Sequence, residues 1–270
     1  MVALKDIKRR MLGIEDLKKI TGTMYMVSSI RFKSTQTEVK YIDDLIAKLS
    51  DIMRKTPFEP RPMAAPPLFI VMGSDRGLAG GYNANLLDKV YEKLKEHKDP
   101  KITLLGRKVE KFFVEKGLEI MKRYTDIGGK LPAKMLNDII SQAIESYNND
   151  SEIYVAYTHF AGALRLEPKI VKLLPPSMPE GHQERGYIFE PLPEELLKLL
   201  TEFYLKISIE SFFLHSHVSE QAARMVAMES ATDNADELLE DLGTQYHRRR
   251  KDIITGEIAE IVSGAEGISH

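Results

Sequence analysis

The sequence predicts an α/β domain in the middle of the chain, flanked by N- and C-terminal helices that pair as a protruding antiparallel coiled coil. Three observations support this fold class. All 13 prolines lie between Pro57 and Pro193, so none interrupts a helix at either end of the 270-residue chain. Apolar residues at both ends recur at steps of three and four, the spacing of a coiled-coil stripe. Between the two ends, short β-rich runs alternate with helical stretches, as in α/β domains.

The first helix is expected over residues 1–56. Two steps of three follow each other at Ile14, Leu17 and Ile20. Such a slip is a stammer, so we expect the supercoil to be locally overwound there. The whole apolar stripe comprises Leu4, Ile7, Met11, Ile14, Leu17, Ile20, Met24 and Val27, and later Ile42, Leu45, Leu49 and Ile52.

The last helix is expected over residues 194–268. At about 1.5 Å per residue it is on the order of 100 Å long, whereas a compact domain is about 30 Å across. We therefore expect it to protrude and to bury its stripe against the first helix. The alternative is that Gly243 or the stretch "SFFLHSHVS" (211–219) breaks it into ordinary core helices. Regular three-four spacing is kept at Met225, Met228, Thr232, Ala235, Leu239, Leu242 and Tyr246.

Charges are arranged in blocks on the two helices. Residues 1–33 carry eight Lys or Arg against three acids, and residues 229–241 carry six acids and no base. Opposed blocks favour an antiparallel register, although each exposed pair contributes only about 1 kcal/mol or less. The alternative is a solvated face. The net charge of -2 excludes a globally basic nucleic-acid binder.

The middle domain is expected over residues 67–190. Its best candidate site is "VMGSDRGLAGGYNANL" (71–86), which follows a predicted strand and leads into a helix at about Asn83, the context in which phosphates bind. The glycines do not give G-x-G-x-x-G, no G-K-S/T follows, and no acidic residue ends the next strand. Two interpretations stay open: a nucleotide site, or a tight strand-to-helix turn in which Asp75 and Asn83 bond backbone amides.

Several kinds of chemistry are not expected. The chain has no cysteine, which excludes disulfides and thiolate zinc sites. His215 and His217 are two residues apart on a predicted helix and point about 200° apart, so they do not share a metal ion. The sequence predicts no catalytic residue and no cofactor. No apolar run approaches the roughly 20 residues that span a bilayer, and the N-terminus lacks the apolar centre of a signal peptide.

Three stretches together resemble the γ subunit of the F-type ATP synthase. They are "LKDIKRRMLGIEDLKKITGTMYMVSSIRF" (4–32), "GSDRGLAGGYNANL" (73–86) and the C-terminal residues 219–268. Within the last, "ITGEIAEIVSGA" (254–265) fits the pattern IT-x-E-I-x-E-I-x-x-G-A, which serves to recognise that family. The stretches occur in the family's order and cover almost the whole chain.

The resemblance implies a rotor shaft with no catalytic site of its own. In that family the terminal helices wind as an antiparallel coiled coil inside a ring of three α and three β subunits. A Rossmann-like α/β foot sits near the membrane ring of c subunits, and the ε subunit is a further partner. Ion flow turns the foot, and the shaft drives each β site through its conformations. The implied location is the cytoplasmic face of the bacterial inner membrane, peripherally bound.

The resemblance also implies roles for particular residues. Arg250, Thr255 and Glu257 match positions that contact a loop of β, and Arg224 and Met24 match positions where coupling is sensitive. At the neighbouring contact position, Lys251 departs from the pattern, where a glutamine is common. A tip that turns in a hydrophobic sleeve of the α and β ring is expected to include Ile258, Ile261, Val262, Ala265 and Ile268.

Two other classes of protein remain as alternatives to the shaft. One is a nucleotide-binding α/β enzyme that uses residues 71–86, which tight nucleotide binding by the isolated chain would favour. The other is a coiled-coil scaffold without motor partners, which failure to assemble with α and β subunits would support.

Overall fold

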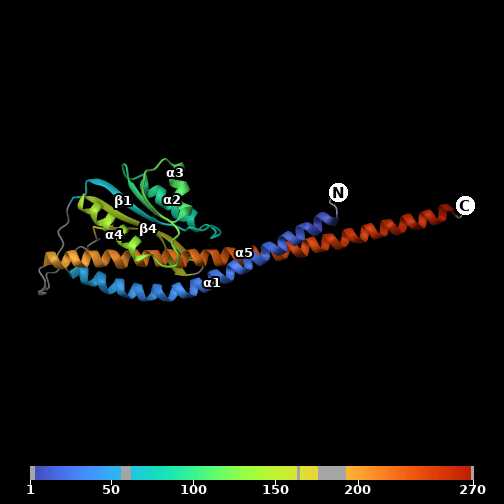
Figure 1. Ribbon diagram of the computed structural model, residues 1–270, viewed down its shortest axis with the longest axis horizontal. Coiled ribbons are helices and arrows are strands. Elements are labelled where there is room, and N and C mark those ends of the chain that lie inside the picture. The colour runs from blue at the N-terminus through green and yellow to red at the C-terminus, as the bar shows by residue number, and fades with distance from the viewer. Residues whose placement is uncertain (1–3, 56–61, 163–164, 176–192, 269–270) are drawn as a thin grey trace. The chain divides into compact units, whose positions relative to one another are not determined.

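The computed structural model describes residues 4–55, 62–162, 165–175 and 193–268 (Figure 1). Two helices of unusual length begin and end the described chain, and a small α/β region lies between them in sequence. The elements in order are α1 (Leu4–Lys55), β1 (Ala65–Met72), α2 (Tyr82–Leu94), β2 (Lys101–Leu105), α3 (Arg107–Glu115), β3 (Ile120–Tyr124), α4 (Ala133–Asn148), β4 (Ser151–Gly162), β5 (Arg165–Leu174) and α5 (Pro193–Ile268). No described helix is long and apolar enough to cross a membrane.

Helix α5 runs for 76 residues without interruption. It passes through residues 211–219, and through Gly243, where a Cβ atom would meet nothing within 4 Å. The alternative of several short core helices is therefore wrong. With the 52-residue α1, the two long terminal helices around a central sheet are confirmed.

The chain divides into two compact units, and each long helix contributes to both. The helical unit is formed by Met1–Val27 and Met225–His270. The sheet unit is formed by Ser28–Arg224. The second half of α1 and the first half of α5 are thus structural parts of the α/β region rather than appendages to it.

The sheet of the sheet unit has the strand order β3-β2-β1-β4-β5. The first four strands are mutually parallel, and β5 runs antiparallel to β4 at the edge. Chain order reverses at β1, which is followed in sequence by β2 on one side but paired with β4 on the other. In doubly wound sheets of this kind, ligands bind outside the carboxyl ends of the strands at that reversal.

Helices cover both faces of the sheet because successive side chains of a strand point to opposite faces. Phe69 and Val71 pack with α2 and α3, whereas Leu68 and Ile70 pack with α4 and α5. In the core between the sheet and helices α4 and α5, the fully or largely buried residues of α5 are Leu205, Ile209 and Phe213. Strand β1 is buried on both faces, which explains its continuous apolar run "LFIVM".

A third core joins α1 to α5 inside the sheet unit. Val39, Ile42 and Leu49 of α1 pack with Ile207, Leu214 and Val218 of α5. Phe160 of β4 adds an edge-to-face contact with Phe32 of α1, with ring centroids 5.5 Å apart. Apolar packing therefore holds α1 onto α5 and, through Phe160, onto the end of β4.

Candidate functional site

The two long helices pair antiparallel in the helical unit. The hydroxyls of Thr21 and Thr232 lie 2.7 Å apart, and the Lys18 ammonium donates to the Asp236 carboxylate. The partner number on α5 falls as the number on α1 rises, which defines the antiparallel direction. Lys18 belongs to the basic block and Asp236 to the acidic block, so one ion pair joins the two blocks, in keeping with the first of the two interpretations that the sequence left open.

The predicted seam of α5 is confirmed. All seven of its positions are buried or half-buried, whereas their neighbours Asp233, Asp236 and Glu240 are exposed. The most buried members are Met228 and Ala235. The seven positions are Met225, Met228, Thr232, Ala235, Leu239, Leu242 and Tyr246.

The predicted stammer in α1 is wrong. Leu17 and Ile20 are 58% and 55% exposed, and the buried or half-buried positions that follow Ile14 are instead Lys18 and Thr21. The seam thus keeps regular steps of four and three. Polar side chains occupy it because Asp236 and Thr232 offer matching partners on α5. Two large aliphatic side chains consequently face outward from the pair.

The C-terminal part of α5 has no cover within the described chain. All 13 residues from Lys251 to Ser263 are exposed, including Thr255 and Glu257, and Arg250 before them is exposed as well. Their predicted contacts with a β subunit remain predictions. Met24 is half-buried in the helical unit.

The expected tip residues are also uncovered where their side chains are described. Ile258, Ile261 and Val262 are 56%, 72% and 51% exposed. Ala265 and Ile268 belong to the helix, but their side chains lie outside the described residues. If another protein chain buried these three side chains, the free energy of association would gain several kcal/mol, at about 1.5 to 3 kcal/mol for each side chain.

The segment 71–86 forms a tight turn between β1 and α2. Asn83 accepts from the backbone amide of Ser74 at 3.1 Å, and Asp75 accepts from the amides of Arg107 and Ile127 at 3.0 and 2.7 Å. This confirms the interpretation as a strand-to-helix turn whose Asp and Asn bond backbone amides. Leu78 holds a positive φ of 61°, which shows how tightly the chain reverses here.

Arg224 of helix α5 holds this turn through a set of hydrogen bonds, which we call the Arg224 clasp. The guanidinium donates to the carbonyl of Gly77 at 3.3 and 3.2 Å, to that of Arg76 at 3.3 Å, and to the Glu220 carboxylate at 2.6 Å. Arg224 is only 5% exposed. The position where the family resemblance places sensitivity of coupling therefore has its side chain bonded inside the chain.

Serines of α5 fill the place where the strand order reverses. The Ser216 hydroxyl accepts from the amide of Thr158 at 3.2 Å and lies 3.4 Å from the carbonyl of Met72, and the Ser219 hydroxyl donates to the carbonyl of Thr158 at 3.1 Å. These bonds tie α5 to the end of β1 and to the neighbouring part of β4. A dinucleotide in the usual crevice would have to displace α5, which argues against the nucleotide-site interpretation of residues 71–86.

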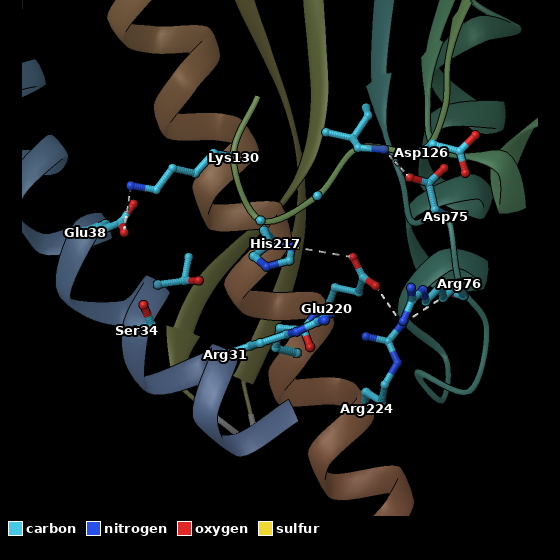
Figure 2. Close-up of a pocket in the computed structure, with 15 residues that line it drawn as sticks. Arg31, Ser34, Glu38, Asp75, Arg76, Asp126, Lys130, His217, Glu220 and Arg224 are labelled. Carbon is cyan, nitrogen blue, oxygen red and sulfur yellow. Dashed lines mark hydrogen bonds and ion pairs between the residues drawn. The ribbon is translucent and has the colours of Figure 1, made fainter. Parts of the chain in front are cut away.

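A polar cavity of about 490 Å³ opens beside this clasp, within the sheet unit (Figure 2). Its walls come from four segments that are distant in sequence. These are α1 (Arg31 to Glu38), the turn after β1 (Asp75, Arg76), the loop after β3 (126–130) and α5 (His217 to Arg224).

Burial changes the pKa values of two side chains on the α5 wall of the cavity, His217 and Glu220. It lowers the pKa of the His217 imidazole to about 4, helped by the positive charges of Arg31 and Arg224. Burial also raises the pKa of the Glu220 carboxyl, and the Arg224 guanidinium only partly offsets this. His217 is therefore neutral at pH 7, and its Nδ1 lies 3.9 Å from Glu220.

The two histidines of α5 occupy separate environments, as expected. His215 Nε2 lies 2.9 Å from the Asp43 carboxylate of α1. His217 instead stacks on Phe213 and faces the cavity. Across the described ranges no group of three or more potential metal ligands is found.

Sequence reasoning did not find the cavity. Its walls meet only after α1 and α5 fold onto the sheet, and Arg31 and Gln221 carry no motif. The one local signal was the glycine pair in "DIGGK" (126–130), between a strand and a helix, in a region that otherwise looked unremarkable. Glycine-rich loops that lead into a helix N-terminus recur at anion sites.

Comparisons with known proteins agree with the resemblance. The family model described as ATP synthase matches residues 3–268. The ATP synthase gamma chain of Moorella thermoacetica is 34% identical over 281 residues, covering 99% of this chain and 100% of the relative. That of Glaesserella parasuis is 35% identical over 288 residues, with coverages of 99% and 100%.

Solved structures share the fold. A chain in the OSCP/F1/c-ring structure of the Euglena gracilis mitochondrial ATP synthase gives a TM-score of 0.74 at 17% identity, covering 98% of this chain and 94% of that one. A chain in the central stalk and c-ring structure of the Tetrahymena thermophila mitochondrial ATP synthase gives 0.60 at 21% identity, with coverages of 78% and 99%.

Proposed function

Because the chain belongs to the ATP synthase gamma chain family, we propose that it is the central-stalk rotor subunit of an F-type ATP synthase. In this role it couples ion flow through a membrane c ring to ATP synthesis or hydrolysis at the β subunits. It does so by rotation inside an α3β3 ring and has no catalytic site of its own. Its partners are the α, β and ε subunits and the c ring, in a complex on the cytoplasmic face of a bacterial inner membrane.

The observation that carries this proposal is the exposed end of α5. An enzyme or a self-sufficient scaffold gains nothing from thirteen consecutive exposed helical residues that include Ile253, Ile254, Ile258, Ile261 and Val262. A shaft that ends inside a sleeve formed by other chains requires such a surface. The apolar side chains supply contact, and their burial then occurs only on assembly.

The outward face of α1 supports the same function. Leu17 and Ile20 stay exposed because the seam uses Lys18 and Thr21 in their place. The helix pair therefore exposes large aliphatic side chains that its own seam does not cover. Coupling to three β sites in different states requires different contacts with each state, and an asymmetric surface provides them.

The location proposed above rests on relatives alone. The bacterial gamma chains of Moorella thermoacetica and Glaesserella parasuis match nearly the full length of this chain. The structural neighbours belong to mitochondrial ATP synthases, in assemblies that include the c ring, and the likeness to them is one of fold.

The test is reconstitution of the full chain with α and β subunits, followed by measurement of ATP turnover with and without this chain. Thr255→Ala and Glu257→Ala should each lower the turnover that depends on this chain, while the far-UV circular dichroism of the isolated variants stays that of the wild type. Glu119→Ala, an exposed glutamate of the sheet unit, serves as the matched control and should leave turnover unchanged. Failure of the wild-type chain to assemble with α and β would reject the proposal in favour of a scaffold without motor partners.

A further inference from the structure

The polar cavity in the sheet unit has no part in the function proposed above. It lies outside the carboxyl ends of β1 and β3, on the side of the sheet covered by α5 (Figure 2). At about 490 Å³ it falls within the range of small-molecule sites, about 300 to 1,000 Å³. The balance between its free donors and its free acceptors indicates what it would bind.

The acidic side chains that line the cavity are already bonded. Both oxygens of Asp75 accept backbone amides, and Glu220 accepts from Arg224 at 2.6 Å. Glu38 pairs with Lys130 at 3.2 Å, and Asp126 accepts from the Arg107 guanidinium at 2.6 Å. Each of the four carboxylates therefore already has a cationic or amide partner, which offsets its negative charge.

The free groups are mainly donors. Arg31 on the α1 wall and Arg76 on the opposite turn form no side-chain hydrogen bond or ion pair with any described residue. The positive charge of Arg31 nevertheless acts across the cavity on the α5 wall. It contributes to the lowered pKa of His217, and it opposes the rise in the pKa of Glu220 that burial causes. Each guanidinium offers five N–H groups in a planar fork that matches phosphate and carboxylate oxygens.

Two largely buried polar side chains at the cavity, Gln221 and Thr35, are left free to bind a molecule inside it. Gln221 is 2% exposed and Thr35 is 7% exposed, and neither side chain is hydrogen-bonded to another described residue. Polar groups inside a protein are normally hydrogen-bonded, so polar atoms that stay open to a cavity are suited to bind a ligand that enters it. Their placement at the cavity wall fits a site whose missing partner is a ligand.

We propose that this cavity binds a small polyanion that carries a diphosphate group. Arg31 and Arg76 grip it from opposite walls, and the Gln221 amide and Thr35 hydroxyl complete the shell. A single tetrahedral phosphate would leave most of the 490 Å³ empty, whereas a diphosphate fills more of it, offers oxygens to both arginines and leaves room for an organic substituent. The ligand would join α1, α5 and two loops of the sheet unit, and so it should stabilise that unit.

The experiment is calorimetric titration of the full chain with inorganic pyrophosphate in magnesium-free buffer, and in parallel with ADP. We expect saturable binding of pyrophosphate. Arg31→Gln and Arg76→Gln should each weaken it about tenfold or more, the usual effect of losing a charged hydrogen-bonding partner. Tighter binding of ADP than of pyrophosphate would identify a nucleotide as the carrier of the diphosphate, and equal binding would identify the diphosphate alone.

A matched control and a second readout separate this site from general charge attraction. Arg248→Gln removes an exposed arginine of the helical unit and should leave the affinity unchanged. In the same titration followed by NMR, the bound anion should raise the pKa of His217, because a nearby negative charge favours the imidazolium. Absence of saturable binding by both probes, or equal weakening by all three arginine variants, would overturn the proposal.

Discussion

Arg224 holds the backbone carbonyl of Gly77 with two of its guanidinium nitrogens, at 3.3 and 3.2 Å, across 147 residues of sequence. The same side chain also holds the carbonyl of Arg76 and the carboxylate of Glu220. Helix α5 is thereby fixed to the turn that begins α2. In the rotor function proposed above, torque that passes between this turn and α5 would act on these bonds.

Arg224→Ala should destabilise the sheet unit by about 3 kcal/mol. The loss combines three hydrogen bonds to backbone carbonyls with a buried carboxylate that no longer has a partner, and breaking such pairs costs about 3 to 5 kcal/mol. The low end is expected because burial already raises the pKa of Glu220, which allows that carboxyl to take up a proton instead. Urea denaturation of the full chain gives the change in the free energy of unfolding.

Two further variants test whether the loss of stability in Arg224→Ala comes from the contacts of Arg224. Adding Glu220→Gln to Arg224→Ala should recover part of the loss, because the unpaired charge is then gone. Arg248→Ala, at an exposed position, should change the unfolding free energy by less than about 0.5 kcal/mol. Equal effects of Arg224→Ala and Arg248→Ala would mean that the clasp contributes nothing.

The threonine pair of the helical unit should behave as one coupled interaction. Thr232 donates to the carbonyl of Met228 at 2.8 Å and can accept from Thr21 at 2.7 Å. Thr21→Val or Thr232→Val alone removes the interhelical hydrogen bond and leaves the other hydroxyl with only its backbone carbonyl, that of Met228 or Lys18, so each should cost about 1 kcal/mol. The double variant replaces both hydroxyls with methyl groups and should cost clearly less than the sum. Thermal melts followed by circular dichroism test this, and strict additivity of the three variants would contradict it.

The sequence predicted features that depend on local pattern. The seam of α5 followed from regular spacing, and the amide bonds of Asp75 and Asn83 followed from a turn between a strand and a helix. The seam of α1 did not, because apolar spacing favoured Leu17 and Ile20, whereas the partner side chains of α5 selected Lys18 and Thr21. Which face of a helix is buried is decided by its neighbour as well as by its own stripe.

The polar cavity could not be predicted from sequence pattern, for a related reason. Arg31 and Gln221 are nearly 200 positions apart in the sequence and meet only through the tertiary fold. Gln221 looks like an ordinary surface residue of a helix, yet it is among the most buried polar side chains. Burial of a polar residue without a hydrogen-bonding motif leaves no trace in a single sequence.

Gly106 should be far less tolerant of substitution than Gly13. Gly106 adopts φ 99°, and a Cβ atom there would lie 2.7 Å from the carbonyl carbon of Gly73. Gly106→Ala should therefore destabilise the chain by about 3 kcal/mol or more, through both backbone strain and overlap with a neighbouring strand end. Gly13→Ala meets nothing within 4 Å in the exposed interior of α1 and should stabilise by about 0.5 to 1 kcal/mol. Urea denaturation of both variants measures the contrast, and a neutral Gly106→Ala would refute the stated close approach.

His217 should make the sheet unit sensitive to mild acid. Its pKa is lowered from 6.5 to about 4 in the folded chain, so between these values the unfolded chain binds the extra proton. Stability from this group is therefore present at pH 7 and is lost as the pH falls, by about 2 kcal/mol between pH 7 and pH 5. Glu220 contributes with the opposite sign, because its raised pKa lets the folded chain take up a proton first.

The comparison of wild type with His217→Gln isolates the contribution of the histidine. The free energy of unfolding of the variant should fall by about 2 kcal/mol less than that of the wild type between pH 7 and pH 5, measured by urea denaturation at pH 7, 6 and 5. His247→Gln, at an exposed position of α5, should follow the wild-type curve, and a His217→Gln curve parallel to the wild type would show that the buried imidazole does not control this response.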